Sequence, residues 1–235
     1  MTKTMQSSVT PPSPVFNIAH RGARSLAPEN TLAAIKKAWH IGAHGVEVDV
    51  SVTADGELIL FHDDLLTRTT DVHAVFPERT NDPVTSFTLK ELRCLDAGSW
   101  FLQSDPLGEI ANGNVSSHER LAMEGLQIPL LGDVLEYVKS KGWYINLELK
   151  EVPPPQTGFP VVERVLELLD TIHFASEDLA ISSFVFDYLR QIQKTRPYIE
   201  VNALIGFPGS GVQDWGDFEF SIYNANSAYT DEKQI

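Results

Sequence analysis

The chain has 235 residues, 43% of them hydrophobic, which is enough for one large domain with its own core or for two small ones. Its 32 acidic residues outnumber its 18 basic residues, so the formal net charge is −14. This charge argues against nonspecific nucleic-acid binding, which needs a basic surface. Residues 1–14 are polar and rich in proline, and no segment approaches the ~18 apolar residues of a transmembrane helix. We therefore expect a disordered leader on a cytoplasmic protein without a transmembrane segment.

The first part of the chain predicts three strands and one helix. A short buried strand is expected at Val15–His20, and the Pro-Glu-Asn sequence after it opens a helix that Asn30 or Thr31 can cap. Strands at Val46–Val50 and Leu58–His62 follow. The link between these two strands is too short for a helix, so we expect an extended crossover there.

After residue 127, predicted strands and helices alternate to the end of the chain. The expected helices are Leu131–Gly142, Phe159–Ile172, Phe186–Arg196 and a capped start at Thr230, and the expected strands are Trp143–Lys150, Leu179–Phe184, Val201–Gly206 and Phe218–Ala225. Such alternation is typical of an α/β fold with a mostly parallel sheet. The seven predicted strands favour a (β/α)8 barrel of the TIM type, with a doubly wound sheet as the alternative. Residues 63–127 have little strand signal, and we interpret them as an elaboration over one face of the barrel.

Two carboxylates interrupt the second strand. Glu47 and Asp49 are two residues apart, so they share one face of the strand, while Val46, Val48 and Val50 share the other. A solvated edge strand would explain the pair, but the valine face favours burial. Two like charges side by side in a buried site need a positive partner.

Polar residues also lie at the ends of three other predicted strands. His20 ends the first strand and is followed by Arg21, His62 ends the third, and Glu148 shares a face with Lys150 in the fourth. The carboxyl ends of barrel strands meet at one mouth, where catalytic groups gather. Three carboxylates at this mouth would suit Ca²⁺ or Mg²⁺ better than zinc. The alternatives are structural histidines, a surface arginine, and an ion pair between Glu148 and Lys150.

Several segments together resemble the glycerophosphodiester phosphodiesterase family. They are AHRGARSLAPENTLAAI, GAHGVEVDVSVTADGELILFHDDLLTRTT, TLKELRCLDAGSWF, IPLLGDVLEYV and INLELK, and their His-Arg-Gly, Pro-Glu-Asn-Thr, Glu-x-Asp, His-Asp and Glu-x-Lys elements occur in the family's order. The resemblance implies a phosphodiesterase barrel over residues 15–235 and hydrolysis of glycerophosphodiesters to sn-glycerol 3-phosphate and an alcohol. It also implies roles for seven residues: Glu47, Asp49 and Glu148 hold the divalent metal, His20 and His62 act as general acid and base, and Arg21 and Lys150 help to bind the phosphate.

The resemblance departs from the family at the end of the chain. The Trp-Thr-Val-Asn-like segment of the last barrel strand has no counterpart here, so we expect the barrel to lack its C-terminal strand. Two alternatives follow. A barrel without that strand could bind phosphodiesters without turning them over, and a lysophospholipase D-type activity could use the same scaffold with another leaving group.

Overall fold

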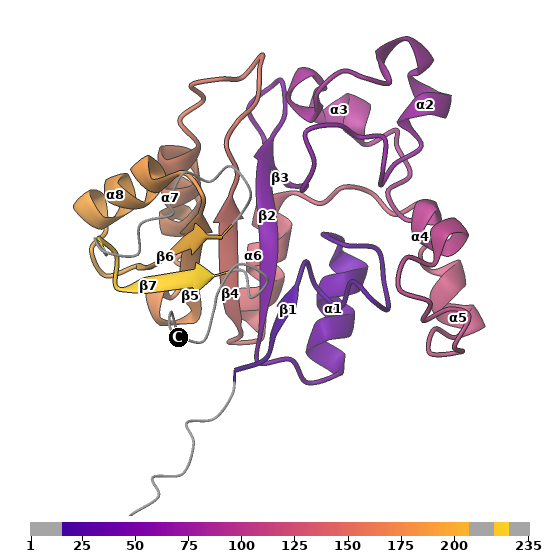
Figure 1. Cartoon of the computed structure of the whole chain (residues 1–235), viewed down its shortest axis with the longest axis horizontal. Coiled ribbons are helices and arrows are strands. Elements are labelled where there is room, and N and C mark those ends of the chain that lie inside the picture. Colours follow the sequence, from indigo (N-terminus) through magenta and orange to yellow (C-terminus); the bar gives the residue numbers. More distant parts are fainter. Residues whose placement is uncertain (1–15, 207–218, 226–235) are drawn as a thin grey trace, which may run out of the picture.

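Seven strands of the described residues form one curved sheet (Figure 1). The structure, a computed structural model, describes residues 16–206 and 219–225. Six strands run parallel, in the order β1-β2-β4-β5-β6-β7. The strands are β1 Ile18–His20, β2 Gly45–Val52, β3 Leu58–Leu60, β4 Tyr144–Leu149, β5 Leu179–Ser183, β6 Glu200–Ile205 and β7 Ile222–Ala225. The described chain is therefore an α/β fold whose parallel strands curl into a half-barrel, as the alternation of strands and helices predicts.

β3 differs from the prediction, because it runs antiparallel to β2. Val50 lies opposite Leu60 across the pair, and the turn between the strands is closed by a hydrogen bond from Thr53 N to Glu57 O of 3.0 Å. The expected extended crossover is wrong, since a connection this short joins antiparallel neighbours through a turn. Six of the seven strands therefore belong to the parallel barrel. The expected lack of the C-terminal barrel strand concerns none of the described residues and stays a prediction.

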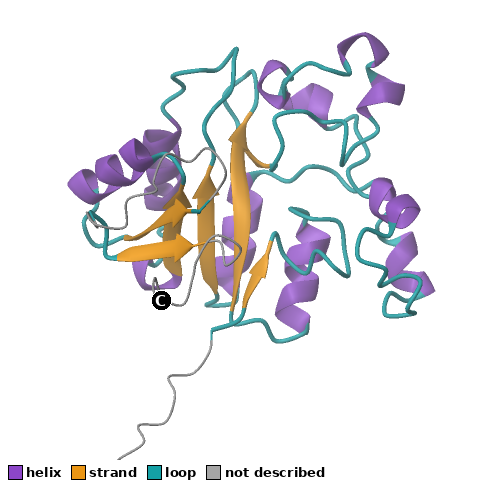
Figure 2. Cartoon of the chain, viewed as in Figure 1, coloured by secondary structure: helices purple, strands orange, loops and turns teal. Residues whose placement is uncertain are grey.

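Four helices pack against the outer face of the sheet (Figure 2). They are α1 Leu32–His40, α6 Leu131–Ser140, α7 Val161–Thr171 and α8 Phe186–Thr195. Thr31 caps α1, its hydroxyl accepting a hydrogen bond from Ala34 N, as the sequence predicts. The core between helices and sheet contains Ile35 of α1, Leu135 of α6 and Val165 of α7 together with the valines of β2.

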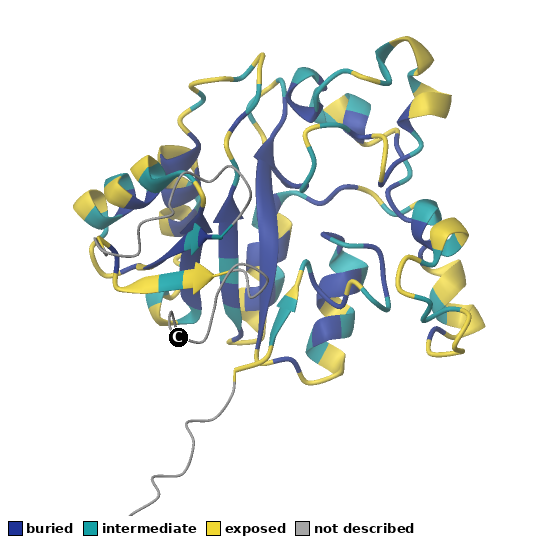
Figure 3. Cartoon of the chain, in the orientation of Figure 1, coloured by how far each residue is buried: buried dark blue, intermediate teal, exposed yellow. Residues whose placement is uncertain are grey.

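β2 lies between β1 and β4 and is buried along its whole length (Figure 3). Val46, Val48 and Val50 belong to the outer core, so the alternation of a strand turns Glu47 and Asp49 to the inner face of the sheet. The helix-covered face supplies the apolar burial, and the inner face is left for polar chemistry.

Residues 63–127 connect β3 to α6 without adding a strand. They contain α2 Val72–Val75, α3 Leu89–Leu92, α4 Ser99–Ser104, α5 Ser117–Leu121 and the 3₁₀ turns Pro77–Arg79 and Val84–Ser86; a third 3₁₀ turn, Ser176–Asp178, precedes β5. Two separate apolar clusters hold this region together, one around Phe87 and one around Phe101. The predicted leader and the helix expected at Thr230 lie outside the described residues. None of the helices described is both long and apolar enough to cross a bilayer.

Candidate functional site

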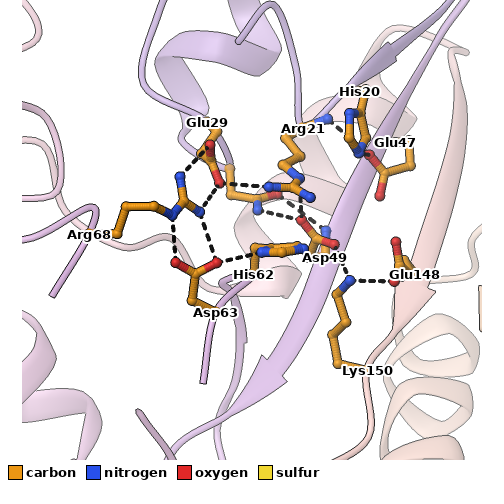
Figure 4. Close-up of polar contacts among 11 residues, drawn as sticks. His20, Arg21, Glu29, Glu47, Asp49, His62, Asp63, Arg68, Glu148 and Lys150 are labelled. Carbon is orange, nitrogen blue, oxygen red and sulfur yellow. Dashed lines mark hydrogen bonds and ion pairs between the residues drawn. The ribbon is translucent and has the colours of Figure 1, made fainter. Parts of the chain in front are cut away.

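Three buried carboxylates meet on the inner face of the sheet (Figure 4). Glu47 and Asp49 come from β2, and Glu148 lies opposite Asp49 on the neighbouring β4. One oxygen atom from each of the three lies within 4.8 Å of the others, and the Asp49 residue is 0% exposed. The alternative of a solvated edge strand is therefore wrong.

Two cations neutralise part of this charge. Lys150 Nζ lies 3.0 Å from Asp49 Oδ1 and also contacts Glu148 Oε1, and Arg21 Nε lies 3.1 Å from Asp49 Oδ2. Burial acts to raise the pKa of Asp49, but the charges of Lys150 and Arg21 outweigh it and the pKa is lowered. Asp49 is therefore ionised at neutral pH. The ion pair between Glu148 and Lys150, left open by the sequence, is present here together with the carboxylate cluster.

The pKa values of Glu47 and Glu148 shift in the opposite direction, upwards. Burial, with the nearby charge of Asp49, raises the pKa of Glu47 to about 8, although the Arg21 backbone N–H donates a 2.9 Å hydrogen bond to its Oε2. Burial also raises the pKa of Glu148, against the attraction of Lys150. Glu47 therefore carries a proton at neutral pH unless a further cation compensates its charge.

The carboxylates fit a divalent cation. Among the described residues, no group donates a hydrogen bond to the buried atom Glu47 Oε1. Unsatisfied buried oxygens of this kind are costly, and oxygen donors are the ligands that Ca²⁺ and Mg²⁺ prefer. Glu47, Asp49 and Glu148 are therefore the residues that could hold such an ion.

His20 lies at the end of β1 beside the carboxylates. Its Nε2 is 3.7 Å from Glu47 Oε2, and its side chain is half-exposed. Partial burial, followed by the charges of Arg21 and Arg24, lowers the pKa of His20 to about 4. The imidazole is thus neutral at pH 7 and able to accept a proton.

His62 follows β3 and has a carboxylate partner of its own. Its Nδ1 lies 2.5 Å from Asp63 Oδ1, and Arg68 Nε lies 2.5 Å from the other oxygen of Asp63. Glu29 Oε1 accepts hydrogen bonds from Arg68 Nη2 at 2.7 Å and from Arg21 Nη1 at 3.0 Å. A continuous chain of ionic contacts therefore links His62 to the arginine beside the carboxylates.

Four residues of this network were not assigned from the sequence. Glu29, Asn30, Asp63 and Arg68 lie inside the motifs that carry the family resemblance, but each is a residue type common on surfaces. Asn30 is buried and adopts the left-handed backbone region with φ 54°, which asparagine tolerates. Its Nδ2 donates to Asp49 Oδ2 at 2.8 Å, and its Oδ1 accepts from Asp49 N at 3.2 Å. Only the fold reveals that these residues hold the site.

A pocket of about 650 Å³ opens beside the carboxylates. His62, Glu148 and Lys150 are among the residues that line it. Val152 and Phe184, from the loops after β4 and β5, contribute an apolar wall. The pocket is large enough to hold part of a small organic molecule next to the ionic groups.

All seven residues assigned from the sequence gather in this region. His20 and Arg21 lie at the end of β1, and Glu47 and Asp49 lie in β2. His62 follows β3, Glu148 lies in β4, and Lys150 directly follows β4. The structure brings them together as expected from the ends of barrel strands. Their individual roles remain predictions.

The sequence matches the glycerophosphoryl diester phosphodiesterase family over residues 20–210. The chain is similar to the glycerophosphodiester phosphodiesterase of Caldanaerobacter subterraneus, with 34% identity over 187 residues that cover 80% of this chain and 65% of the relative. It is also similar to the glycerophosphoinositol inositolphosphodiesterase of Mus musculus, with 38% identity over 158 residues that cover 67% of this chain and 29% of the relative. The chain thus spans less than two thirds of the length of either curated relative.

Solved structures give the same relationship. A phosphodiesterase of Oleispira antarctica, solved in complex with the product sn-glycerol-3-phosphate, superposes with a TM-score of 0.71 and 27% identity, covering 92% of this chain and 77% of that one. The glycerophosphodiester phosphodiesterase of Agrobacterium tumefaciens has a TM-score of 0.60 and 27% identity, covering 80% of this chain and 65% of that one. Both comparisons agree with the half-barrel described above.

Proposed function

The chain belongs to the glycerophosphoryl diester phosphodiesterase family, and we propose that it hydrolyses glycerophosphodiesters to sn-glycerol 3-phosphate and an alcohol with a divalent cation as cofactor. The observation that carries this proposal is the meeting of Glu47, Asp49 and Glu148 within 4.8 Å, with His20 and His62 beside them. Phosphodiester anions repel nucleophiles, so their hydrolysis needs both positive charge and acid–base groups.

The charged residues divide between the cation and the phosphate. Glu47, Asp49 and Glu148 would hold Ca²⁺ or Mg²⁺, which supplies positive charge to the phosphate oxygens when bound. Arg21 and Lys150 would exchange contacts with the carboxylates for contacts with the phosphate. Their ion pairs with Asp49, which hold both cations beside the carboxylates, support this role.

The two histidines suit opposite halves of the proton transfer. His20 is neutral at pH 7, so it would accept the proton of the nucleophile, which is either water or the neighbouring glycerol hydroxyl. An ionised Asp63 can only accept a hydrogen bond, so Nδ1 of His62 carries the hydrogen in their contact. When the ring also carries a hydrogen on Nε2, that nitrogen would give its proton to the leaving alcohol.

A coupled assay for released sn-glycerol 3-phosphate tests this function. We expect release from glycerophosphocholine with Ca²⁺ or Mg²⁺, loss of release with EDTA, and a fall in kcat of about 10²-fold or more in His62→Ala. His118→Ala is the matched control, because His118 is exposed on α5 outside the site. Equal rates for wild type and His62→Ala would reject the role of His62.

The same assay separates the alternatives. A noncatalytic barrel would bind the diester without releasing product from it. The apolar wall at Val152 and Phe184 also supports trying a lysophospholipase D-type substrate, lysophosphatidylcholine, in a second arm. Release of choline from that substrate, faster than from glycerophosphocholine, would favour the lipid activity. The cytoplasmic location and the boundaries of the leader and the elaboration remain predictions.

A further inference from the structure

The inner face of the sheet carries a row of polar side chains that continues beyond the carboxylates. Asp49 lies opposite Glu148, Glu148 opposite Ser182, and Ser182 opposite Asn202, across the adjacent strands β2, β4, β5 and β6. Residues paired in register point to the same face of a sheet. The row therefore starts at the candidate cation site and extends along the inside of the half-barrel.

Two members of this row are buried without complete hydrogen bonding. Ser182 is 1% exposed and Asn202 is 6% exposed. Within the described part of the chain, nothing pairs with Ser182 Oγ or Asn202 Oδ1, while Asn202 Nδ2 donates to Glu200 Oε1 at 3.3 Å. The buried Oδ1 of Asn146, opposite Glu47 and one layer below, is also unpaired. An unsatisfied buried polar group destabilises a fold, so three of them beside a candidate active site indicate a missing partner.

The neighbouring Ser183 shows what a structural serine looks like in this strand. It faces the other side of the sheet, where its hydroxyl donates to Leu149 O at 2.7 Å and accepts from Val185 N at 2.9 Å. The consecutive serines therefore differ in one respect: Ser183 has both of its bonds within the protein, and Ser182 has none. A stabilising role in the fold explains the hydroxyl of Ser183 but not that of Ser182.

The free groups fit a neutral hydroxyl-bearing ligand. Amide oxygens and a serine hydroxyl accept hydrogen bonds from hydroxyl groups, and neither Ser182 nor its direct register partner Asn202 carries a charge. The half of a glycerophosphodiester that all such substrates share is glycerol, which carries two free hydroxyl groups. The pocket lined by Lys150 and Phe184 would leave a separate place for the variable alcohol.

We propose that Ser182 and Asn202 bind the hydroxyl groups of the glycerol half of the substrate and make the site selective for diesters that contain glycerol. This inference rests on the proposed function, since it names the part of the substrate that the inner row recognises. Asn146 would add an acceptor from the layer below. The substrate would then lie with glycerol over β5 and β6 and its alcohol in the pocket beyond Lys150.

The test compares two diesters, glycerophosphocholine and bis(4-nitrophenyl) phosphate, which lacks glycerol. In Ser182→Ala and Asn202→Ala we expect kcat/KM for glycerophosphocholine to fall about tenfold, because each removes a hydrogen bond to substrate, and kcat/KM for the other diester to change less than twofold. An equal change for both diesters would overturn the inference, and so would no change for either.

Ser183→Ala provides the matched control. We expect it to lower the urea midpoint and to leave the ratio of the two kcat/KM values unchanged, whereas Ser182→Ala keeps the midpoint or raises it. Calorimetric binding of sn-glycerol 3-phosphate and of methyl phosphate repeats the comparison without turnover. Wild type that binds glycerol phosphate tightly but hydrolyses nothing would reject the proposed function alone; Ser182→Ala that binds both phosphates like wild type would reject the inference alone.

Discussion

His62 Nδ1 lies 2.5 Å from Oδ1 of Asp63, the next residue in the chain. Adjacent residues rarely face each other in a regular strand, and this contact forms because β3 ends at Leu60, before either of them. Arg68 holds both oxygens of Asp63, with its Nε at 2.5 Å and its Nη2 at 2.9 Å. The carboxylate is therefore fixed, and it orients the imidazole towards the cation site.

Asp63→Asn should weaken catalysis without removing the imidazole. We expect kcat to fall about 10- to 100-fold and KM to change less than threefold, because the ring loses a fixed acceptor while the phosphate contacts remain. Asp133→Asn is the control, since Asp133 is exposed on α6, which packs on the outer face of the sheet. Steady-state kinetics on glycerophosphocholine measure kcat and KM for both variants and for wild type. A rise in KM with an unchanged kcat would show that Asp63 serves substrate binding instead.

Lys150→Met should destabilise the protein in a cation-dependent way. Removing the ammonium group leaves the buried Asp49 with one fewer positive partner, at a cost of about 3 kcal/mol in the free energy of unfolding. Saturating Ca²⁺ or Mg²⁺ should restore part of the loss, because a bound ion compensates the same charge. Urea denaturation with EDTA and with each metal measures this difference, with the exposed Lys194→Met as control. A loss of equal size in every condition would contradict the expectation.

Local signals in the sequence predict much of the fold. The capping position at Thr31, the period-two valines of β2 and the alternation after residue 127 depend on neighbours in the chain, and each is confirmed. No local signal of this kind predicts the direction of β3. A five-residue link fits either an extended crossover or a turn, and only the pairing of Val50 with Leu60 decides between them.

The residues of the site also fall into two groups, those that the sequence predicts and those that it does not. Glu47 and Asp49 stand out because charges interrupt an apolar strand, and the ends of parallel strands predict where their partners gather. Asp63 and Arg68 carry no such signal, since a charged pair five residues apart is ordinary on a surface. Ser182 cannot be distinguished from Ser183 in the sequence at all. Their difference depends on which face of β5 each one occupies.

Gly22→Ala tests the turn that places Arg21. Gly22 has φ 78°, and a Cβ there would lie 2.7 Å from the backbone carbon of Ala34 in α1. Backbone strain and overpacking together should cost about 3 kcal/mol of unfolding free energy or more. Gly42→Ala has a similar φ of 83° but open space around it, so it should cost only about 1 kcal/mol. Equal urea midpoints for the two variants would contradict the close approach of α1.

Glu119→Gln tests the contact between α1 and α5 through its pH dependence. Hydrogen bonds from Lys37, at 2.5 Å, and from Ser116 lower the pKa of Glu119 to about 2 from its usual 4.5. A carboxyl with a depressed pKa stabilises the fold above its unfolded value and loses this effect as the pH falls towards 2. Wild type should exceed the variant by about 0.5 kcal/mol at pH 7 and match it near pH 2, as measured by urea denaturation. A difference that stays constant with pH would show that the charge is irrelevant.

The cation site itself is tested most directly by calorimetric titration of Ca²⁺ and Mg²⁺ into wild type and Glu47→Gln. Because the pKa of Glu47 is raised to about 8, glutamine resembles its protonated form, so the variant should keep the urea midpoint of wild type in EDTA. We predict one divalent ion per chain in wild type and binding at least about tenfold weaker in the variant. Equal affinities in both proteins, or no binding to wild type, would contradict the assignment of these carboxylates as a metal site.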